Sequence, residues 1–269
     1  MTDTGHGHGT DGVHTGKAHS ARMYDYFLNG KDHYPVDAEA AEQVLKVLPD
    51  ARRLARANRG FMRRAARHLA RQGIRQFLDV GTGIPTEPNL HQVVQEIAPD
   101  ARIVYVDNDP VVLRHAEALL RGTRAGRTEY VQADVREPAK IVAEAREVLD
   151  FREPVALSLV ALLHFLPDEA EPQEVLRTLL EPLPSGSVLM LAHGTGDFDP
   201  EALGRVTEIY RASGMSLRLR DRAEVSALFQ GLELAAPGVV PLEEWDFEPE
   251  GAEVETAGVP VYVGLARKP

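Results

Sequence analysis

Two glycines follow a short apolar segment in the stretch DVGTGIPTEPN, residues 79–89. Glycines at positions 81 and 83 let the backbone pass close to a bound nucleotide. A dinucleotide fingerprint needs a third glycine three residues later, where this chain has Thr86, and the lysine of a phosphate-binding P-loop is also missing. Asp79 would repel a pyrophosphate but can accept a hydrogen bond from an ammonium group. The loop therefore favours a nucleotide that carries an amino-acid moiety.

Carboxylates also follow the next two apolar segments. Asp107 ends VYVD and can accept hydrogen bonds from both ribose hydroxyls, with Asn108 continuing the turn. Asp134 follows YVQA and can accept from an adenine amine, while the backbone N–H of Val135 can reach a ring nitrogen. Together with Asp79, these residues predict one binding rim.

His164 lies just after the apolar segment that ends near Val160 or Ala161. An imidazole titrates near neutral pH, so His164 is a candidate general base for a substrate hydroxyl. It could equally form a wall of the cofactor pocket, or do neither. His193, in LAHGTG, is a second candidate for the base.

Alternating elements are expected to position these residues. The strands are short and mostly apolar, which is typical of parallel strands covered on both faces. Two late strands joined by a long connection suggest an antiparallel pair that closes the sheet. We therefore predict an α/β fold with a doubly wound, seven-stranded, mostly parallel sheet. Strands are expected at 76–80, 102–106, 129–133, 155–160, 187–192, 232–240 and 260–266, and helices at 36–47, 50–72, 90–97, 110–121, 138–149, 169–180, 200–212 and 222–230.

Three regions are expected along the chain. Residues 1–20 are rich in Gly, Thr and His and predict a disordered tail, whose histidines could bind a metal ion adventitiously. Residues 21–73 predict a helical lid rich in aromatic residues, and residues 74–269 the sheet domain. The second lid helix carries eight arginines, which we interpret as a solvated face, with nucleic-acid binding as the alternative.

Composition excludes several classes of function. The chain has 269 residues, a formal net charge of -11 and no cysteine. The acidic balance argues against sequence-independent binding to nucleic acid or anionic lipid, and thiolate metal sites are excluded. No apolar segment is long enough to span a membrane and none resembles a signal peptide. We expect a cytoplasmic protein with no resident metal.

The chain resembles class I S-adenosylmethionine (SAM)-dependent methyltransferases over residues 21–268. More narrowly, it is similar to a bacterial family known as S-adenosyl methyltransferase, formerly a domain of unknown function, whose substrate is not established. The first two of the matching stretches are specific to that family. The stretches are ARMYDYFLNGKDHY, ARANRGFMRRA, FLDVGTGIPTEPNLH, VYVDNDPVVL, ADVREP, LVALLHFLPD and VYVGLARKP.

This resemblance implies that SAM is the methyl donor. Asp79, Gly81 and Gly83 would line its methionine side, Asp107 and Asn108 its ribose, and Asp134 and Val135 its adenine, with Val160 and Ala161 packed against it. The lid residues Arg22, Tyr26 and Asn58 would close over the pocket. The segment LLHFLPDE also resembles ILHDWSDE in small-molecule O-methyltransferases, where the histidine is the base, although Phe165 replaces the aspartate here.

The expected reaction is a direct displacement in which a substrate oxygen, nitrogen or carbon attacks the methyl group of SAM. We expect a small-molecule acceptor, with O-methylation as the first case to consider, and a homodimer is compatible with the sequence. A SAM-binding protein without catalysis and a nucleic-acid methyltransferase are the alternatives. A nicotinamide-dependent oxidoreductase would share Asp107, but the third glycine and a Tyr-x-x-x-Lys pair are missing.

Overall fold

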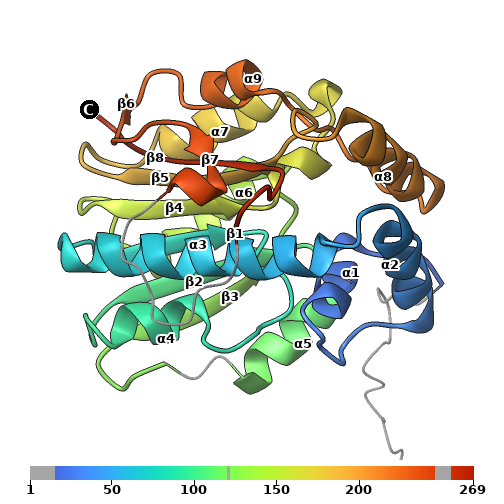
Figure 1. Cartoon of the computed structure of the whole chain (residues 1–269). Helices are drawn as coiled ribbons and strands as arrows, with labels where there is room; N and C mark the ends of the chain where they lie inside the picture. The colour runs from blue at the N-terminus through green and yellow to red at the C-terminus, as the bar shows by residue number, and fades with distance from the viewer. Residues whose placement is uncertain (1–15, 120–121, 246–255) are drawn as a thin grey trace, which may run out of the picture.

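A single mixed sheet with helices on both faces forms the centre of the molecule (Figure 1). This computed structural model describes residues 16–119, 122–245 and 256–269. The strand order is β3-β2-β1-β4-β5-β8-β6, with β7 also paired to β8. Neighbouring strands from β3 to β5 are parallel, and β8 runs antiparallel to β5. The predicted doubly wound sheet with a reversed late strand is confirmed.

The bounds of the elements follow the predicted alternation. The strands are Gln76–Val80 (β1), Arg102–Asp107 (β2), Arg127–Gln132 (β3), Val155–Val160 (β4), Val188–Gly194 (β5), Glu233–Leu234 (β6), Val240–Pro241 (β7) and Val261–Arg267 (β8). The α-helices are Ser20–Phe27 (α1), Pro35–Val47 (α2), Ala51–Arg71 (α3), Leu90–Gln95 (α4), Pro110–Leu119 (α5), Pro138–Ala145 (α6), Pro172–Leu180 (α7), Pro200–Ala212 (α8) and Arg222–Ala227 (α9).

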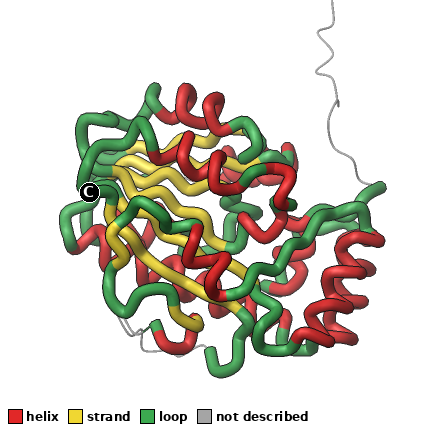
Figure 2. The backbone as a smooth tube through the Cα atoms, turned by 90° about the horizontal axis from the view of Figure 1, so that it is seen from above, coloured by secondary structure: helices red, strands yellow, loops and turns green. Residues whose placement is uncertain are grey.

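Burial on both faces explains why the strands read as continuous apolar segments. All five residues of β1 are buried. Phe77 packs into a core with α3 and α4, whereas Leu78 packs into a second core with α6, α7 and α9. Figure 2 shows the strands as one twisted layer between these two sets of helices. Because the strands are parallel, the ends of β1, β2 and β4 meet at one edge.

The late part of the sheet differs from the prediction. The single strand expected over 232–240 is two short strands, β6 and β7, that pair with opposite ends of β8. Pro237 cannot donate a ladder hydrogen bond, and Gly238 has a φ of 94°. The segment between β6 and β7 therefore turns away from the sheet. The helix expected over 169–180 begins at Pro172, after a 3₁₀ turn at Asp168–Ala170.

The helical segment before the sheet, which was predicted as a lid and keeps that name below, begins earlier than the sequence indicated. His19 caps α1 and Ser20 is its first residue, so these two residues are not part of the expected tail. The remainder of that tail up to residue 15, with His6, His8 and His14, lies outside the described residues. α1, α2 and α8 gather at one end of the sheet (Figure 1), where they share a third apolar cluster with the first turns of α3.

A buried polar cluster connects the two lid helices α1 and α2 to each other and to the sheet. Asp37 is fully buried and accepts hydrogen bonds from the backbone N–H of His19 and of Tyr34, both at 2.8 Å. Arg22 is 4% exposed, and its Nε lies 3.5 Å from an oxygen of Asp37 and 3.3 Å from an oxygen of Asp109. Asp109 follows β2, so the cluster connects α1 and α2 to the edge where the strands end.

Across the part of the chain described here, no helix has both the length and the apolar character to cross a bilayer.

Replacing Asp37 by Ala tests how much this cluster stabilises the lid. The change removes an acceptor for two backbone N–H groups and one of the two carboxylates beside Arg22. We expect the free energy of unfolding, measured in urea, to fall by about 3 kcal/mol. Glu39→Ala, an exposed position on the same helix, should change it by less than about 0.5 kcal/mol. Equal effects of the two substitutions would show that the cluster contributes nothing specific.

Candidate active site

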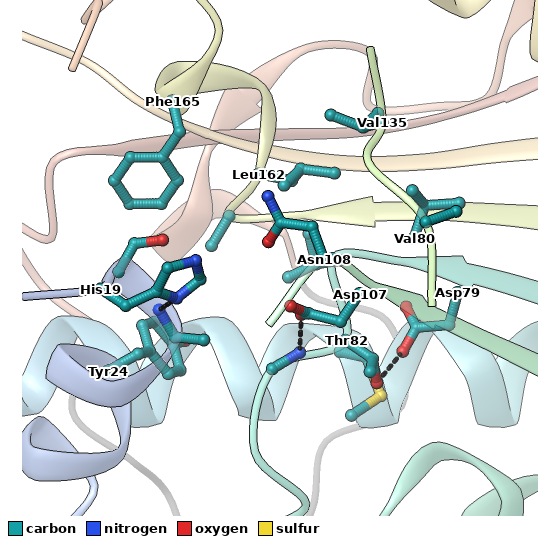
Figure 3. A pocket seen from close by; sticks show the side chains of 18 of the residues that line it. His19, Tyr24, Asp79, Val80, Thr82, Asp107, Asn108, Val135, Leu162 and Phe165 are labelled. Carbon is teal, nitrogen blue, oxygen red and sulfur yellow. Dashed lines mark hydrogen bonds between the residues drawn. The ribbon is translucent and has the colours of Figure 1, made fainter. Parts of the chain in front are cut away.

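A pocket opens at the edge where β1, β2 and β4 end, beneath α1 and α3. Figure 3 shows His19, Tyr24 and Phe165 on one side of it, and Asp79, Val80 and Val135 on the other. The glycine loop and the turn after β2 form its floor. The lining residues are His19, Ser20, Ala21, Tyr24, Arg59, Met62, Asp79, Val80, Gly81, Thr82, Gly83, Asp107, Asn108, Ala133, Val135, Val160, Ala161, Leu162 and Phe165.

The glycine loop leaves room for a ligand. Gly81 and Gly83 have φ values of 77° and 66°, a left-handed conformation that other residues adopt at a cost. A Cβ at Gly81 would stand 2.7 Å from the side chain of Leu162, whereas a Cβ at Gly83 would meet nothing within 4 Å. Gly81 thus allows close packing inside the protein, and Gly83 keeps open space above the loop.

Asp79 supplies a buried carboxylate at the end of β1. It is 7% exposed and accepts a hydrogen bond from the hydroxyl of Thr82 at 2.9 Å. Burial raises its pKa above the usual 3.8, while Ser158, Thr82 and the charge of Arg59 act in the opposite direction. A cationic ligand beside Asp79 would stabilise the ionised carboxylate and offset this cost of burial.

Asp107 joins the two turns that form the floor. Its Oδ2 accepts from the backbone N–H of Gly83 at 2.8 Å, and its Oδ1 accepts from that of Asp109 at 3.0 Å. Each oxygen retains a lone pair for a ligand hydroxyl. Burial raises the pKa of Asp107, although both N–H groups favour the ionised form. The carboxylate is thus oriented before any ligand binds.

Arg59 places a positive charge beside these carboxylates. It projects from α3, and its guanidinium donates to the carbonyl of Ile84 at 3.1 Å and approaches that of Thr82 at 3.5 Å. Arg63, one turn further along, donates to the carbonyls of Pro88 and Glu87. The prediction of a solvated arginine face was therefore wrong for these two residues, which brace the glycine loop. Only Arg59 of the two lines the pocket.

The structure brings together eight of the twelve residues predicted to bind the cofactor. These eight line the pocket: Asp79, Gly81, Gly83, Asp107, Asn108, Val135, Val160 and Ala161. Ala161 has a φ of 58° and donates its N–H to Ala192 at 3.0 Å, so an unfavourable backbone conformation is maintained at the pocket wall.

The other four lie outside this pocket. Arg22 contacts Asp37 and Asp109 behind the wall, and Tyr26 bonds through its hydroxyl to Glu42 on the outside of the lid. Asp134 is held by two nitrogens of Arg136 and also accepts from Asn108 at 3.1 Å. These bonds lower its pKa to about 2 and engage both carboxylate oxygens. Asn58 lines the second pocket described below.

Several lining residues were not among the predicted site residues. Ser20 and His19 fell within the expected tail, and Arg59 was one of eight similar arginines, so nothing in its local sequence distinguished it. In the sequence, Tyr24 stood out only as one of several aromatic residues of the predicted lid. Phe165 stood out only because it replaces the aspartate of the O-methyltransferase segment. Thr82 could have been predicted to line the pocket, because it lies between the two glycines of the loop. The full set is His19, Ser20, Ala21, Tyr24, Arg59, Met62, Val80, Thr82, Ala133, Leu162 and Phe165.

A second pocket adjoins the first and shares Tyr24, Ala161 and Phe165 with it. α2, the first half of α3 and α8 enclose this second pocket, and its lining is mainly apolar. His164 lies here rather than in the first pocket. The complete lining is Tyr24, Phe27, Val44, Leu48, Ala51, Leu54, Ala55, Asn58, Ala161, His164, Phe165, Gly194, Thr195, Leu203, Val206, Tyr210, Leu217, Leu219, Pro260 and Val261.

Both candidate histidines are held neutral. The Nδ1 atom of His164 accepts the backbone N–H of Gly194 at 3.2 Å, and burial lowers its pKa well below 6.5. His193 contacts the carbonyl of Gly194 through Nδ1 at 2.7 Å and Arg220 through Nε2 at 3.1 Å. Burial lowers the pKa of His193 to about 4. His193 lines neither pocket, and no described group of His, Asp and Glu side chains has the arrangement of a metal site.

The first pocket fits SAM in its chemistry. Asp79 can accept from the α-ammonium group, Arg59 can pair with the α-carboxylate, and Asp107 can accept from the ribose hydroxyls. The apolar Ala133, Val135 and Leu162 can pack against an adenine ring. The reversed strand β8 and this arrangement of groups at the strand ends define a SAM-dependent methyltransferase.

Comparison with known proteins agrees with this class. Residues 6–269 match the model of the S-adenosyl methyltransferase family. A DUF574 family protein from Streptomyces avermitilis is 48% identical, with 95% of this chain and 99% of that chain covered and a TM-score of 0.89. A candidate methyltransferase from Thermobifida fusca is 34% identical, with 94% and 95% covered and a TM-score of 0.84. The chain belongs to the S-adenosyl methyltransferase family, and SAM is its cofactor.

More distant structures share the fold alone. An O-methyltransferase family protein from Burkholderia thailandensis is 13% identical, with 91% of this chain and 63% of that chain covered and a TM-score of 0.50. No curated protein sequence matches the chain.

Replacing Arg59 by Met tests whether its guanidinium pairs with the carboxylate of SAM. Loss of a charge-assisted hydrogen bond should raise the dissociation constant of SAM by roughly 10-fold to 100-fold, as measured by calorimetry. Arg63→Met is the matched control, since Arg63 also donates to carbonyls of the loop but does not line the pocket. If both variants weaken binding equally, the effect of Arg59 comes from bracing the loop.

The affinity for SAM should also depend on pH through Asp79. The raised pKa means that Asp79 gains a proton at a higher pH than an ordinary aspartate, and the neutral form no longer attracts an ammonium group. Calorimetry from about pH 7 down to about pH 4.5 should show weakening affinity. Asp79→Asn should bind weakly throughout, with a flatter pH dependence. An unchanged pH dependence in this variant would assign the titration to another group.

Proposed function

We propose that the protein transfers the methyl group of SAM to a small molecule bound in the second pocket. The observation that carries this proposal is the shared wall: Tyr24, Ala161 and Phe165 line both pockets. A donor in the first pocket and an acceptor in the second would therefore lie next to each other, with these three residues at the junction. Proximity of this kind supplies much of the catalysis in a direct displacement.

The enclosure of the second pocket supports a small acceptor. Its walls come from the lid helices and from α8, and they are apolar over most of their area. A nucleic acid needs an open basic surface, whereas Arg59 and Arg63 of the arginine helix donate to the protein's own carbonyls. The net charge of -11 also disfavours a polyanionic substrate.

The chain's own side chains would orient the reactants and exclude water. Tyr24 and Phe165 place aromatic rings at the junction, where a ring face can stabilise a positive charge. The bound cofactor supplies an electrophilic methyl group on sulfur. Location in the cytoplasm and assembly into a homodimer remain predictions from the sequence.

Filling the second pocket should separate catalysis from cofactor binding. Leu217→Trp adds volume to this pocket on a residue that does not line the first. With labelled SAM and a library of small metabolites, we expect methyl transfer to fall by at least about tenfold, while the dissociation constant of SAM changes by less than about twofold. Leu234→Trp, at an exposed position on β6, is the control.

Two outcomes would contradict the proposal. Label transferred to DNA or RNA but to no small molecule would favour the nucleic-acid alternative. Tight SAM binding without transfer to any acceptor would favour a SAM-binding protein without catalysis.

A further inference from the structure

The second pocket has a lining that suits an uncharged occupant. Its described polar members are Tyr24, Asn58, His164, Thr195 and Tyr210, and none of the described lining side chains is Asp, Glu, Lys or Arg. A charged compound would lose its hydration there without gaining an ionic partner, which is costly. The occupant is therefore mainly apolar and neutral when it binds.

His164 is poorly suited to accept a proton from that occupant. Its Nδ1 lone pair already accepts the N–H of Gly194, so the ring proton belongs on Nε2. Protonating Nδ1 would set two N–H groups against each other, and the alternative tautomer would do the same. Burial and the neighbouring charge of Arg220 also lower the pKa of His164. His164 can donate a hydrogen bond from Nε2, but it is not arranged as a base.

The remaining hydroxyl groups do not provide a base either. The hydroxyl of Tyr24 donates to the carbonyl of Ala55 at 2.9 Å, and burial raises its pKa to about 12. Burial also raises the pKa of Tyr210, which stays a neutral phenol. Thr195 is fully buried and its Oγ1 accepts the backbone N–H of Asp197 at 3.2 Å. A hydroxyl substrate would thus find no described group in this pocket to take its proton before attack.

Asn58 offers the complementary hydrogen-bonding group. Its side chain is 1% exposed, and its carbonyl oxygen has no hydrogen-bond partner within the protein. The Asn58 side chain also lies beside the Tyr24 hydroxyl and partly offsets the effect of burial on the pKa of that phenol. A buried acceptor without a donor is costly. An N–H group on a ligand would satisfy the Asn58 oxygen.

We propose that the methyl acceptor is a neutral amine on an apolar ring system, held in the second pocket with its N–H directed to Asn58. This inference rests on the proposed function and narrows it to nitrogen. The nitrogen lone pair forms the new N–C bond while the C–S bond breaks and leaves its electron pair on sulfur. The positive charge passes from sulfur to nitrogen, so no proton has to leave before the transfer, and the methylated ammonium loses its proton in water after release.

The aromatic rings at the junction suit this charge transfer. Figure 3 shows Phe165 and Tyr24 on the same side of the first pocket, and both residues also line the second. A cation on either side of the junction would therefore lie near these rings, whose faces attract positive charge. A neutral ether product would gain nothing from them.

A matched pair of acceptors tests the proposal. 5-Aminoindane and 5-indanol share one apolar skeleton and differ only in the reacting atom, and both are neutral near pH 7.5. With labelled SAM and the intact protein, we expect methylation of the amine to be at least about tenfold faster in kcat/KM, with the methyl group located on nitrogen by mass spectrometry. For the amine, kcat/KM should vary little between about pH 6.5 and about pH 8.5, because no histidine has to be deprotonated.

Asn58→Leu provides the residue-level test. It should raise KM for the amine by roughly 10-fold with a smaller change in kcat, while the dissociation constant of SAM stays within about twofold. Asn58→Gln should restore part of the affinity because it returns a carbonyl oxygen.

Faster methylation of the indanol would overturn the nitrogen assignment and leave the proposed small-molecule function standing. Methylation of neither compound would overturn the assignment as well, and the metabolite library then decides the proposed function separately. An equal loss of SAM binding and amine binding in Asn58→Leu would place Asn58 in the cofactor pocket and remove it from this scheme.

Discussion

The carboxylate of Asp107 is the contact on which the site depends. It accepts one backbone N–H from the loop after β1 and another from the turn after β2, so it joins its own turn to a loop 24 residues earlier in the chain. These two hydrogen bonds fix the distance between the glycine loop and the turn after β2. It also orients the carboxylate without any side-chain partner, which leaves both oxygens able to accept from a ligand. Burial opposes ionisation of this group, and the two N–H groups offset part of that cost.

The same turn connects the cofactor site to the lid. Asp109 donates its N–H to Asp107, and its own carboxylate lies beside Arg22 of α1. Arg22 in turn lies beside Asp37 of α2, the acceptor for two backbone groups of the lid. Arg22 therefore contacts Asp109 and does not itself line the pocket. The resemblance implied that Arg22 closes over the pocket, whereas its guanidinium lies in a cluster between α1, α2 and the turn after β2.

The sequence predicted the sheet well because each β-strand is buried on both faces. β1 and β4 have the predicted bounds. A short apolar segment between loop residues is compatible with few structures other than a buried strand. β6 and β7 were predicted less well because their length is decided by pairing with β8, a contact distant in the sequence. The start of the lid was missed for a related reason. His19 and Ser20 are polar and follow a segment rich in Gly, Thr and His, whereas the contact of His19 with Asp37 is distant in the sequence.

Individual side-chain roles were predicted only where the backbone alone decides them. Glycines and carboxylates at strand ends lie in the pocket because the parallel sheet places every such end at one edge. Asp134 occupies an equivalent position, yet Arg136, two residues further on, binds its carboxylate, and no strand pattern could show that competition. His164 illustrates the same limit for chemistry. Its position just after β4 follows from the strand pattern, but whether it can take a proton depends on the N–H of Gly194, which comes from β5. The reactive character of that histidine is thus a property of the pairing between two strands, and a pattern of residues along one segment cannot specify it.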